Sequence, residues 1–254
     1  LTEKVTVIDY SRRKVKQKTA FQAALCAMDD ELCAMLAGYM TNKAIVAQYK
    51  EIFPKGHKAY FQKQASFDFS TIVEIITGSS DEDVEKALDL ELPNDTLLWR
   101  NLEQFRADFT QRSSQEPVFN PKHIISAFEI FRFRYYSWNE MHREIFGSQV
   151  LGFAERFLPA NIAMNFANGL NGRVKRGEPT NRSFQLITSD LCIFPPVFDS
   201  LSGLGYQYGL GLEAERRRTM MSEKIPLSQL MLIKERALEE IIATGFSRSC
   251  CIIL

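Results

Sequence analysis

The sequence predicts a mainly α-helical protein with a multi-helix body and a small C-terminal unit. Apolar residues recur at steps of three and four through most of residues 14–170, and helix-capping signals flank these stretches. Hydrophobic residues make up 45% of the chain and charged residues 24%, and nineteen phenylalanines indicate a substantial buried core. We therefore expect a helical body at residues 1–212, used for dimerisation or partner binding, and a distinct unit at residues 213–254.

The first part of the body has the periodicity of short helices. Residues 14–53 carry apolar side chains at helical spacing, which is typical of two helices, before Pro and Gly break the pattern in "FPKGH" at 53–57. The segment "STIVEIITG" at 70–78 predicts a helix that ends at Gly78, and Ser80 is the expected N-cap of the acidic helix that follows.

The second part of the body has three more helical stretches. One begins after Asp95, a candidate N-cap. A longer helix is expected from Asn120, with a proline at its first position, to Gly147. Residues 148–170 continue the helical pattern, interrupted at Pro159.

The C-terminal unit follows a Gly-rich segment, residues 199–213, which we interpret as a hinge. It reads "RRRTMMSEKIPLSQLMLIKERALEEIIATGFSRSCCIIL". Residues 219–225 are expected to form a strand, because Pro226 then ends its hydrogen-bonding ladder. Residues 228–244 have the apolar stripe of an amphipathic helix that Gly245 terminates.

This order of strand, proline, amphipathic helix and glycine turn resembles the ribbon-helix-helix DNA-binding family. The segment "KIPLSQLMLI" is similar to the strand-to-helix corner of the methionine-repressor branch, and "TGFSRS" is similar to the turn between its two helices. Ser247 then starts a second helix that is cut short at Leu254. In overall organisation the chain is similar to the AcaB-like conjugation activators of mobile plasmids.

The resemblance implies a cytoplasmic homodimer that binds double-stranded DNA and regulates transcription, without catalysis, cofactor or metal. Two copies would pair residues 219–225 into an antiparallel ribbon, which fits the major groove. The implied base contacts are Met220, Ser222 and Lys224, and the implied phosphate contacts are Arg216, Arg217, Arg218, Ser247 and Arg248. An alternative interpretation of the same residues is a helical hairpin that packs on the body.

The ending Cys251-Ile252-Ile253-Leu254 also has the form of a prenylation signal, with Cys250 as a second acylation site. On this interpretation the chain is a helical protein-interaction module or effector with a lipidated tail. On the ribbon-helix-helix interpretation these are core residues of the second helix. The encoding frame separates the two, because a prenylation signal requires that the coding sequence stop after Leu254.

Composition and motifs favour neither a membrane span nor an enzyme. The formal net charge is +0, so attraction of the whole molecule to nucleic acid is not expected. The five cysteines include no C-x-x-C pair and are expected to be free thiols, and no apolar run reaches the length of a membrane helix. Basic segments at 11–18 and 172–182 suit either phosphate contact or a solvated surface, whereas "FRFRYYSW" at 131–138 suits either single-stranded nucleic acid or a helix core.

Overall fold

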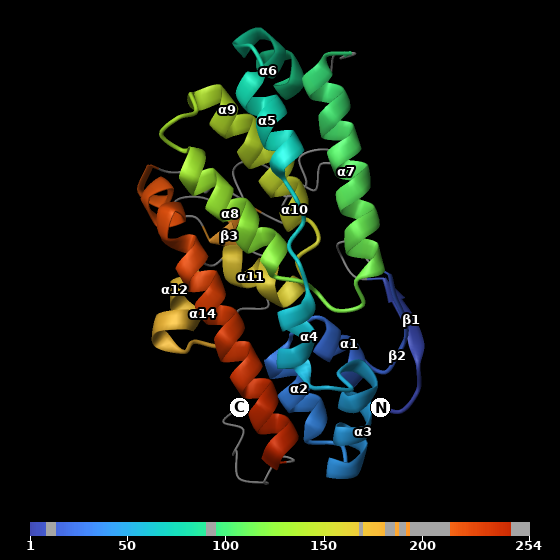
Figure 1. Cartoon of the computed structure of the whole chain (residues 1–254). Helices are drawn as coiled ribbons and strands as arrows, with labels where there is room; N and C mark the ends of the chain where they lie inside the picture. The colour runs from blue at the N-terminus through green and yellow to red at the C-terminus, as the bar shows by residue number, and fades with distance from the viewer. Residues whose placement is uncertain are drawn as a thin grey trace.

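The computed structural model describes residues 1–8, 14–89, 95–167, 170–180, 186–187, 192–193 and 214–244. Within these residues the protein is mainly α-helical with two small two-stranded sheets, and the predicted fold class of the body is confirmed (Figure 1). None of the helices described here combines the length and the apolar composition needed to cross a membrane.

The described residues form short strands and a series of helices. The strands are β1 (Val5–Ile8), β2 (Lys14–Lys18), β3 (Leu186–Ile187) and β4 (Cys192–Ile193). The helices are α1 (Ala20–Cys26), α2 (Asp30–Ala37), α3 (Asn42–Ile52), α4 (His57–Lys63), α5 (Ser70–Gly78), α6 (Asp81–Leu88), α7 (Leu97–Gln115), α8 (Lys122–Arg134), α9 (Glu140–Ile145), the π-helix η1 (Phe146–Gly152), α10 (Phe153–Glu155), α11 (Ala160–Ala167), α12 (Leu170–Arg176) and α14 (Ala214–Thr244).

The N-terminal region corrects the prediction of two helices over residues 14–53. β2 pairs antiparallel with β1, and three helices follow it. α1 begins at a capping box in which the Thr19 hydroxyl accepts from the Gln22 amide and the Gln22 side chain accepts from the Thr19 amide. This box stops the helical pattern from extending back into the lysine-rich strand.

Most helix ends in the middle of the chain follow the predicted caps. Ser80 accepts from a backbone amide at the start of α6, and α5 ends at Gly78, both as predicted. α7 begins one residue later than expected, because Thr96 is its N-cap. The long helix predicted from Asn120 to Gly147 is wrong: α8 begins at Lys122, after Pro121, and ends at Arg134. Asn139 caps a separate helix, α9, and Gly147 lies inside η1 rather than at a helix end.

An aromatic cluster fills the core between α5, α7 and α10. Phe67 and Phe69 contact Phe105 and Phe109, with ring centroids between 5.2 and 6.2 Å apart. Phe153 extends the same cluster, with its ring centroid 5.9 Å from that of Phe105. These edge and tilted arrangements are the favoured geometries of aromatic pairs, so the segment that carries Phe67 and Phe69 is held firmly against α7.

α14 overturns the strand prediction for the C-terminal unit. Residues 219–225 are helical and belong to α14, which continues past Pro226 to Thr244. The segment contains Met, Glu and Lys, which favour helix. A two-stranded ribbon would also have to outweigh the helix that propagates from the packed part of α14. The strand prediction is therefore wrong, and Pro226 lies inside a helix rather than at the end of a strand.

The described side chains of α14 pack on the body. α14 lies along α2, α3, α8 and α12 (Figure 1). Its buried apolar residues fall at helical spacing and belong to the same core cluster as the body; they are Leu227, Leu230, Met231, Leu238 and Ile241. The expected boundary at residue 213 therefore does not separate two cores, and the packed part of α14 matches the alternative of a helix that packs on the body.

A buried group of charges also attaches α14 to the body. Lys234 has no exposed surface, and its Nζ lies 2.7 Å from Oδ1 of Asp30, a residue that is only 3% exposed. Arg173 on α12 donates to the other oxygen of Asp30 at 2.8 Å and contacts Glu31 at 3.1 Å. Lys58 on α4 adds an exposed ion pair, 2.6 Å from Glu239. Because a charge is costly to bury unless it is paired, these contacts fix the position of α14 on α2.

Candidate functional site: a groove between α5 and α8

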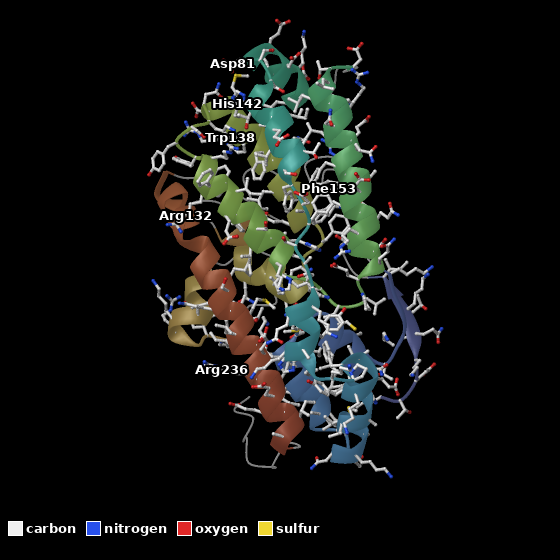
Figure 2. The ribbon with its side chains drawn as sticks, viewed as in Figure 1. Asp81, Arg132, Trp138, His142, Phe153 and Arg236 are labelled. Atoms are coloured by element: carbon white, nitrogen blue, oxygen red, sulfur yellow. The ribbon has the colours of Figure 1, made fainter. Side chains whose placement is uncertain are left out.

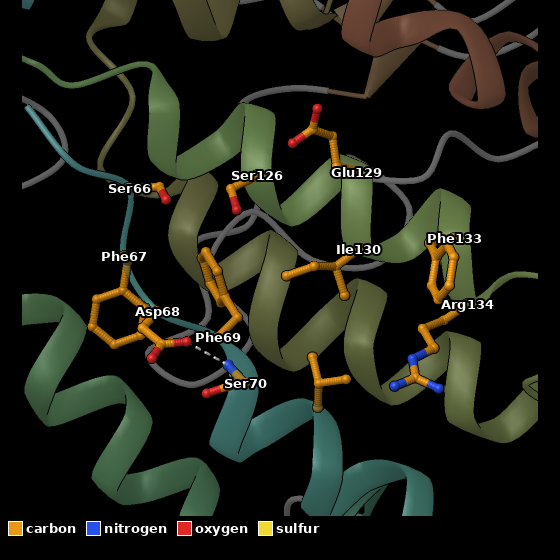
Figure 3. A pocket seen from close by; sticks show the side chains of 11 residues that line it. Ser66, Phe67, Asp68, Phe69, Ser70, Ser126, Glu129, Ile130, Phe133 and Arg134 are labelled. Atoms are coloured by element: carbon orange, nitrogen blue, oxygen red, sulfur yellow. Dashed lines mark hydrogen bonds between the residues drawn. The ribbon is translucent and has the colours of Figure 1, made fainter. Parts of the chain in front are cut away.

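An open groove of about 520 Å³ lies between α8 and the segment that leads into α5. Figure 3 shows the Ser66–Ser70 segment along one wall and α8 along the other, with Ile130 between them. We call this the α5–α8 groove; it is lined by Ser66, Phe67, Asp68, Phe69, Ser70, Val73, Ser126, Glu129, Ile130, Phe133 and Arg134. Its volume lies in the range of ligand-binding pockets, and its floor is apolar.

Helical spacing explains the wall that α8 forms. Ser126, Ile130 and Phe133 follow one another at steps of four and three, so they lie on one face of the helix. The face that packs on the core carries Ile124, Phe128 and other buried residues. The groove residues therefore form a second stripe, of which Ile130 also packs against the edge of the core and Phe133 faces solvent.

Hydrogen bonds hold the opposite wall in place. The Phe67 amide donates to Nδ1 of His123 at 2.8 Å, and Asn120 Nδ2 donates to the carbonyl of Ala65 at 2.9 Å. Lys122 Nζ donates to the carbonyl of Gln64. Because the backbone of this segment is bonded to the start of α8 and Phe67 is packed in the aromatic cluster, the groove is preformed.

The His123 ring is buried, and its orientation is set by two partners. Nδ1 accepts from the Phe67 amide, so Nε2 carries the proton and donates to Oε2 of Glu116 at 3.0 Å. Burial raises the pKa of the Glu116 carboxyl, but the hydrogen bond from His123, with help from Asn120 and Arg112, outweighs it and keeps the pKa below its ordinary value. Both ring nitrogens of His123 are engaged, so its role is to position the wall of the groove.

Two aromatic residues at the end of α8 face solvent. Phe133, at the rim of the groove, is 81% exposed, and Tyr136, just beyond the helix, is 85% exposed. Arg134 lies over the Phe133 ring, 5.8 Å from its centroid. The core interpretation of "FRFRYYSW" holds for Phe131 and Trp138, which are buried, but it is wrong for Phe133 and Tyr136.

The two charged residues at the ends of the groove differ in sign. Asp68 accepts from the Ser70 amide at 2.9 Å, and this hydrogen bond, together with that from the Ser70 side chain, lowers the pKa of Asp68. The carboxylate is exposed and stays charged. Arg134 is half-buried at the other end (Figure 3). In the part of the chain that the structure describes, neither residue forms an ion pair.

The residues predicted to contact DNA are not brought together as a ribbon. The predicted base contacts Met220, Ser222 and Lys224, and the predicted phosphate contacts Arg216, Arg217 and Arg218, all lie in the N-terminal half of α14. The predicted contacts Ser247 and Arg248, the acylation candidates Cys250 and Cys251, and the hinge at 199–213 lie outside the described residues.

The basic segments at 11–18 and 172–182 differ in how far their described residues are exposed. Residues 14–18 form β2, where Lys14 and Lys16 are exposed. In the other segment, Arg173 is committed to Asp30 and Glu31 and is mostly buried, so it is not available for phosphate. Among the described residues, no group of three or more His, Cys, Asp or Glu side chains could hold a metal ion.

Comparisons with known proteins do not assign the chain to a family. No family model matches it, and neither a curated protein nor a solved structure matches it. Function has to be argued from the site itself.

The sequence contains a signal for the groove that our prediction did not use. The buried stripe of α8 includes Ile124, Ala127, Phe128 and Phe131, and the offset of Phe133 from this stripe places it on another face. The partner wall could not be found in this way, because it comes from a segment about 60 residues earlier that is held by hydrogen bonds to side chains of α8 and its preceding turn.

Proposed function

We propose that this protein is a helical protein-interaction module that binds an apolar segment of a partner protein in the α5–α8 groove. The observation that carries the proposal is the 81% exposure of Phe133 at the rim of an open apolar groove. An exposed aromatic side chain beside a groove is typical of interaction sites, and aromatic residues and arginine dominate the energetics of such interfaces.

The character of the groove favours a polypeptide over a small molecule. A small-molecule site is usually concave, with polar groups that converge on one ligand. Here the charges of Asp68 and Arg134 lie at opposite ends, and Phe133 projects at the rim (Figure 3). An extended apolar floor with separated charges is better suited to a segment that continues past both ends.

The contribution of Phe133 can be estimated from its exposure. A phenylalanine side chain offers about 150–250 Å² for burial, and covering roughly 100 Å² contributes about 2.5 kcal/mol. Phe133→Ala should therefore weaken partner binding by roughly thirty-fold or more. It should change the free energy of unfolding by less than about 0.5 kcal/mol, because the side chain is exposed in the free protein.

The test is a selection from a displayed library of random peptides against the full chain, followed by affinity measurements on the enriched peptides. Tyr39→Ala is the matched control, because Tyr39 is 79% exposed and follows α2, away from the groove (Figure 1). The proposal predicts that Phe133→Ala abolishes or strongly weakens binding and that Tyr39→Ala leaves it unchanged. Enriched peptides that bind the Phe133→Ala protein with undiminished affinity would overturn it, as would a selection that enriches none.

A further inference from the structure

The walls of the α5–α8 groove suit a helix better than an added strand. Strand addition needs free backbone groups along an edge. In the 64–67 segment, the carbonyls of Gln64 and Ala65 and the amide of Phe67 are already bonded to side chains of α8 and its preceding turn. The remaining lining comes from Ser70 and Val73 of α5 and from one side of α8, and a groove between two helices is filled best by the side-chain ridge of a third.

The length of the groove sets the size of this third helix. The α8 wall runs from Ser126 to Arg134, which is roughly 12 Å at the rise of an α-helix. This distance corresponds to a little more than two turns. An occupant would therefore place three apolar residues on the floor, spaced four and then three residues apart, and its flanking residues would reach the charged ends.

The charges of Asp68 and Arg134 determine which charged residues the two ends of the bound helix should carry. Asp68 at one end requires a basic group, and Arg134 at the other requires an acidic group. Glu129 also lines the groove, so the middle of the occupant should carry no acid that faces α8.

We infer that the partner segment is an amphipathic helix of two to three turns that lies antiparallel to α8. A free helix is stabilised by acidic residues in its first turn and basic residues in its last turn. A helix with this charge order meets Arg134 with its N-terminal turn and Asp68 with its C-terminal turn, and so it runs opposite to α8. The inference rests on the proposed function and specifies the partner of the same groove.

The experiment compares two synthetic peptides of equal composition. Each has three leucines, spaced four and then three residues apart, on an alanine-based helix. The forward peptide has two Glu in its first turn and two Lys in its last turn, and the reversed peptide exchanges them. Affinities for the full chain are measured by fluorescence anisotropy, on the wild type and on Arg134→Glu, Asp68→Asn and Arg236→Glu. Asp68→Asn keeps an acceptor for the Ser70 amide, and Arg236→Glu is the control with the same change of net charge on an exposed part of α14 (Figure 2).

The wild type should bind the forward peptide about three- to tenfold more tightly than the reversed one, as expected for two partly exposed ion pairs. Arg134→Glu should remove this preference, because both ends of the groove are then acidic. Asp68→Asn should reduce it, and Arg236→Glu should leave it unchanged. High salt should shrink the difference. The reversed peptide is intrinsically less helical, so the deciding quantity is the change in the affinity ratio on Arg134→Glu, from which peptide helicity cancels.

An affinity ratio that is the same for the wild type and Arg134→Glu would overturn the inferred orientation. Failure of the helix inference can be distinguished from failure of the proposed function. If library peptides bind in a Phe133-dependent manner but neither designed peptide does, the helix inference fails and the docking function stands. If no peptide of any kind depends on Phe133, both fail.

Discussion

The buried pair of Lys234 and Asp30 predicts an asymmetric response to mutation. Lys234→Met keeps the length of the side chain and removes the ammonium, which leaves Asp30 with Arg173 at 2.8 Å as its remaining partner. Asp30→Asn removes the carboxylate, and among the described residues no other carboxylate lies within ion-pair distance of Lys234. Arg173, in contrast, still has Glu31 at 3.1 Å. Asp30→Asn therefore leaves the buried ammonium of Lys234 without a counter-ion.

The expected magnitudes follow from this difference. Removing one partner of a buried ion pair costs about 3–5 kcal/mol, which we expect for Asp30→Asn, and Lys234→Met should cost roughly 2 kcal/mol because Arg173 remains. The double change Lys234→Met with Asp30→Leu should cost less than Asp30→Asn alone, because no unpaired charge is left in the core.

Urea unfolding followed by far-ultraviolet circular dichroism measures these differences. Arg236→Met, on an exposed position of the same helix, is the control and should change the free energy of unfolding by less than about 0.5 kcal/mol. The reasoning would be refuted if Lys234→Met cost more than Asp30→Asn, or if both cost no more than the control. Either result would mean that α14 does not lie on α2 through this pair.

Three further predictions concern caps, pH and DNA. Ser80→Ala should lower the free energy of unfolding by about 1 kcal/mol in urea titrations, because a backbone amide at the start of α6 loses its acceptor; an unchanged value would argue against the cap. The folded-state pKa of Glu116 is below its ordinary value of 4.5, so the unfolded state binds the proton more readily and stability is lost as the pH falls below about 4.5. Glu116→Gln should reduce the loss of stability between pH 6 and pH 3.5. An equal loss in the wild type and the variant would contradict this assignment. Binding to double-stranded DNA stays a prediction of the sequence, as does the homodimer. Because residues 219–225 are helical, we expect that Ser222→Ala with Lys224→Ala leaves the binding of random and genomic duplexes unchanged in fluorescence anisotropy. Loss of a sequence preference in this double variant would instead support the ribbon interpretation.

The parts of the fold that the sequence predicted are those with strong local signals. The cap at Ser80, the helix end at Gly78 and the interruption at Pro159 each depend on residues within one turn, and the structure confirms them. The hairpin of β1 and β2 was missed because its strands are short, and the alternation of apolar and polar residues in each covers only about three residues.

The C-terminal error has a different cause. A sequence of seven residues before a proline is compatible with a strand or with a helix, and Pro226 was taken as the decisive residue. The structure tolerates that proline inside α14 because Leu227, Leu230 and the residues after them pack on the body. Tertiary packing outweighed a local breaker signal, and the helix preference of Met, Glu and Lys within the segment was given too little weight.

The candidate site could be predicted only in part. The exposed stripe of α8 follows from its periodicity, but the opposite wall depends on contacts between residues far apart in the chain. Examples are the bond from the Phe67 backbone amide to His123 and the bond from the Asn120 side-chain amide to the Ala65 carbonyl. Local patterns contain no information about such pairings. Asp68 and Arg134 lie at the two ends of one groove only because these contacts bring the two walls together.

The most direct test of the docking groove is a methyl-group NMR titration of the full chain with a peptide enriched in the library selection. Ile130 and Val73 line the groove, whereas Leu232 is 52% exposed on α14 and does not line it. We predict that the methyl resonances of Ile130 and Val73 shift in proportion to binding and that those of Leu232 stay in place. Saturable binding that moves other methyl groups and leaves Ile130 and Val73 unperturbed would contradict the assignment of this groove as the interaction site.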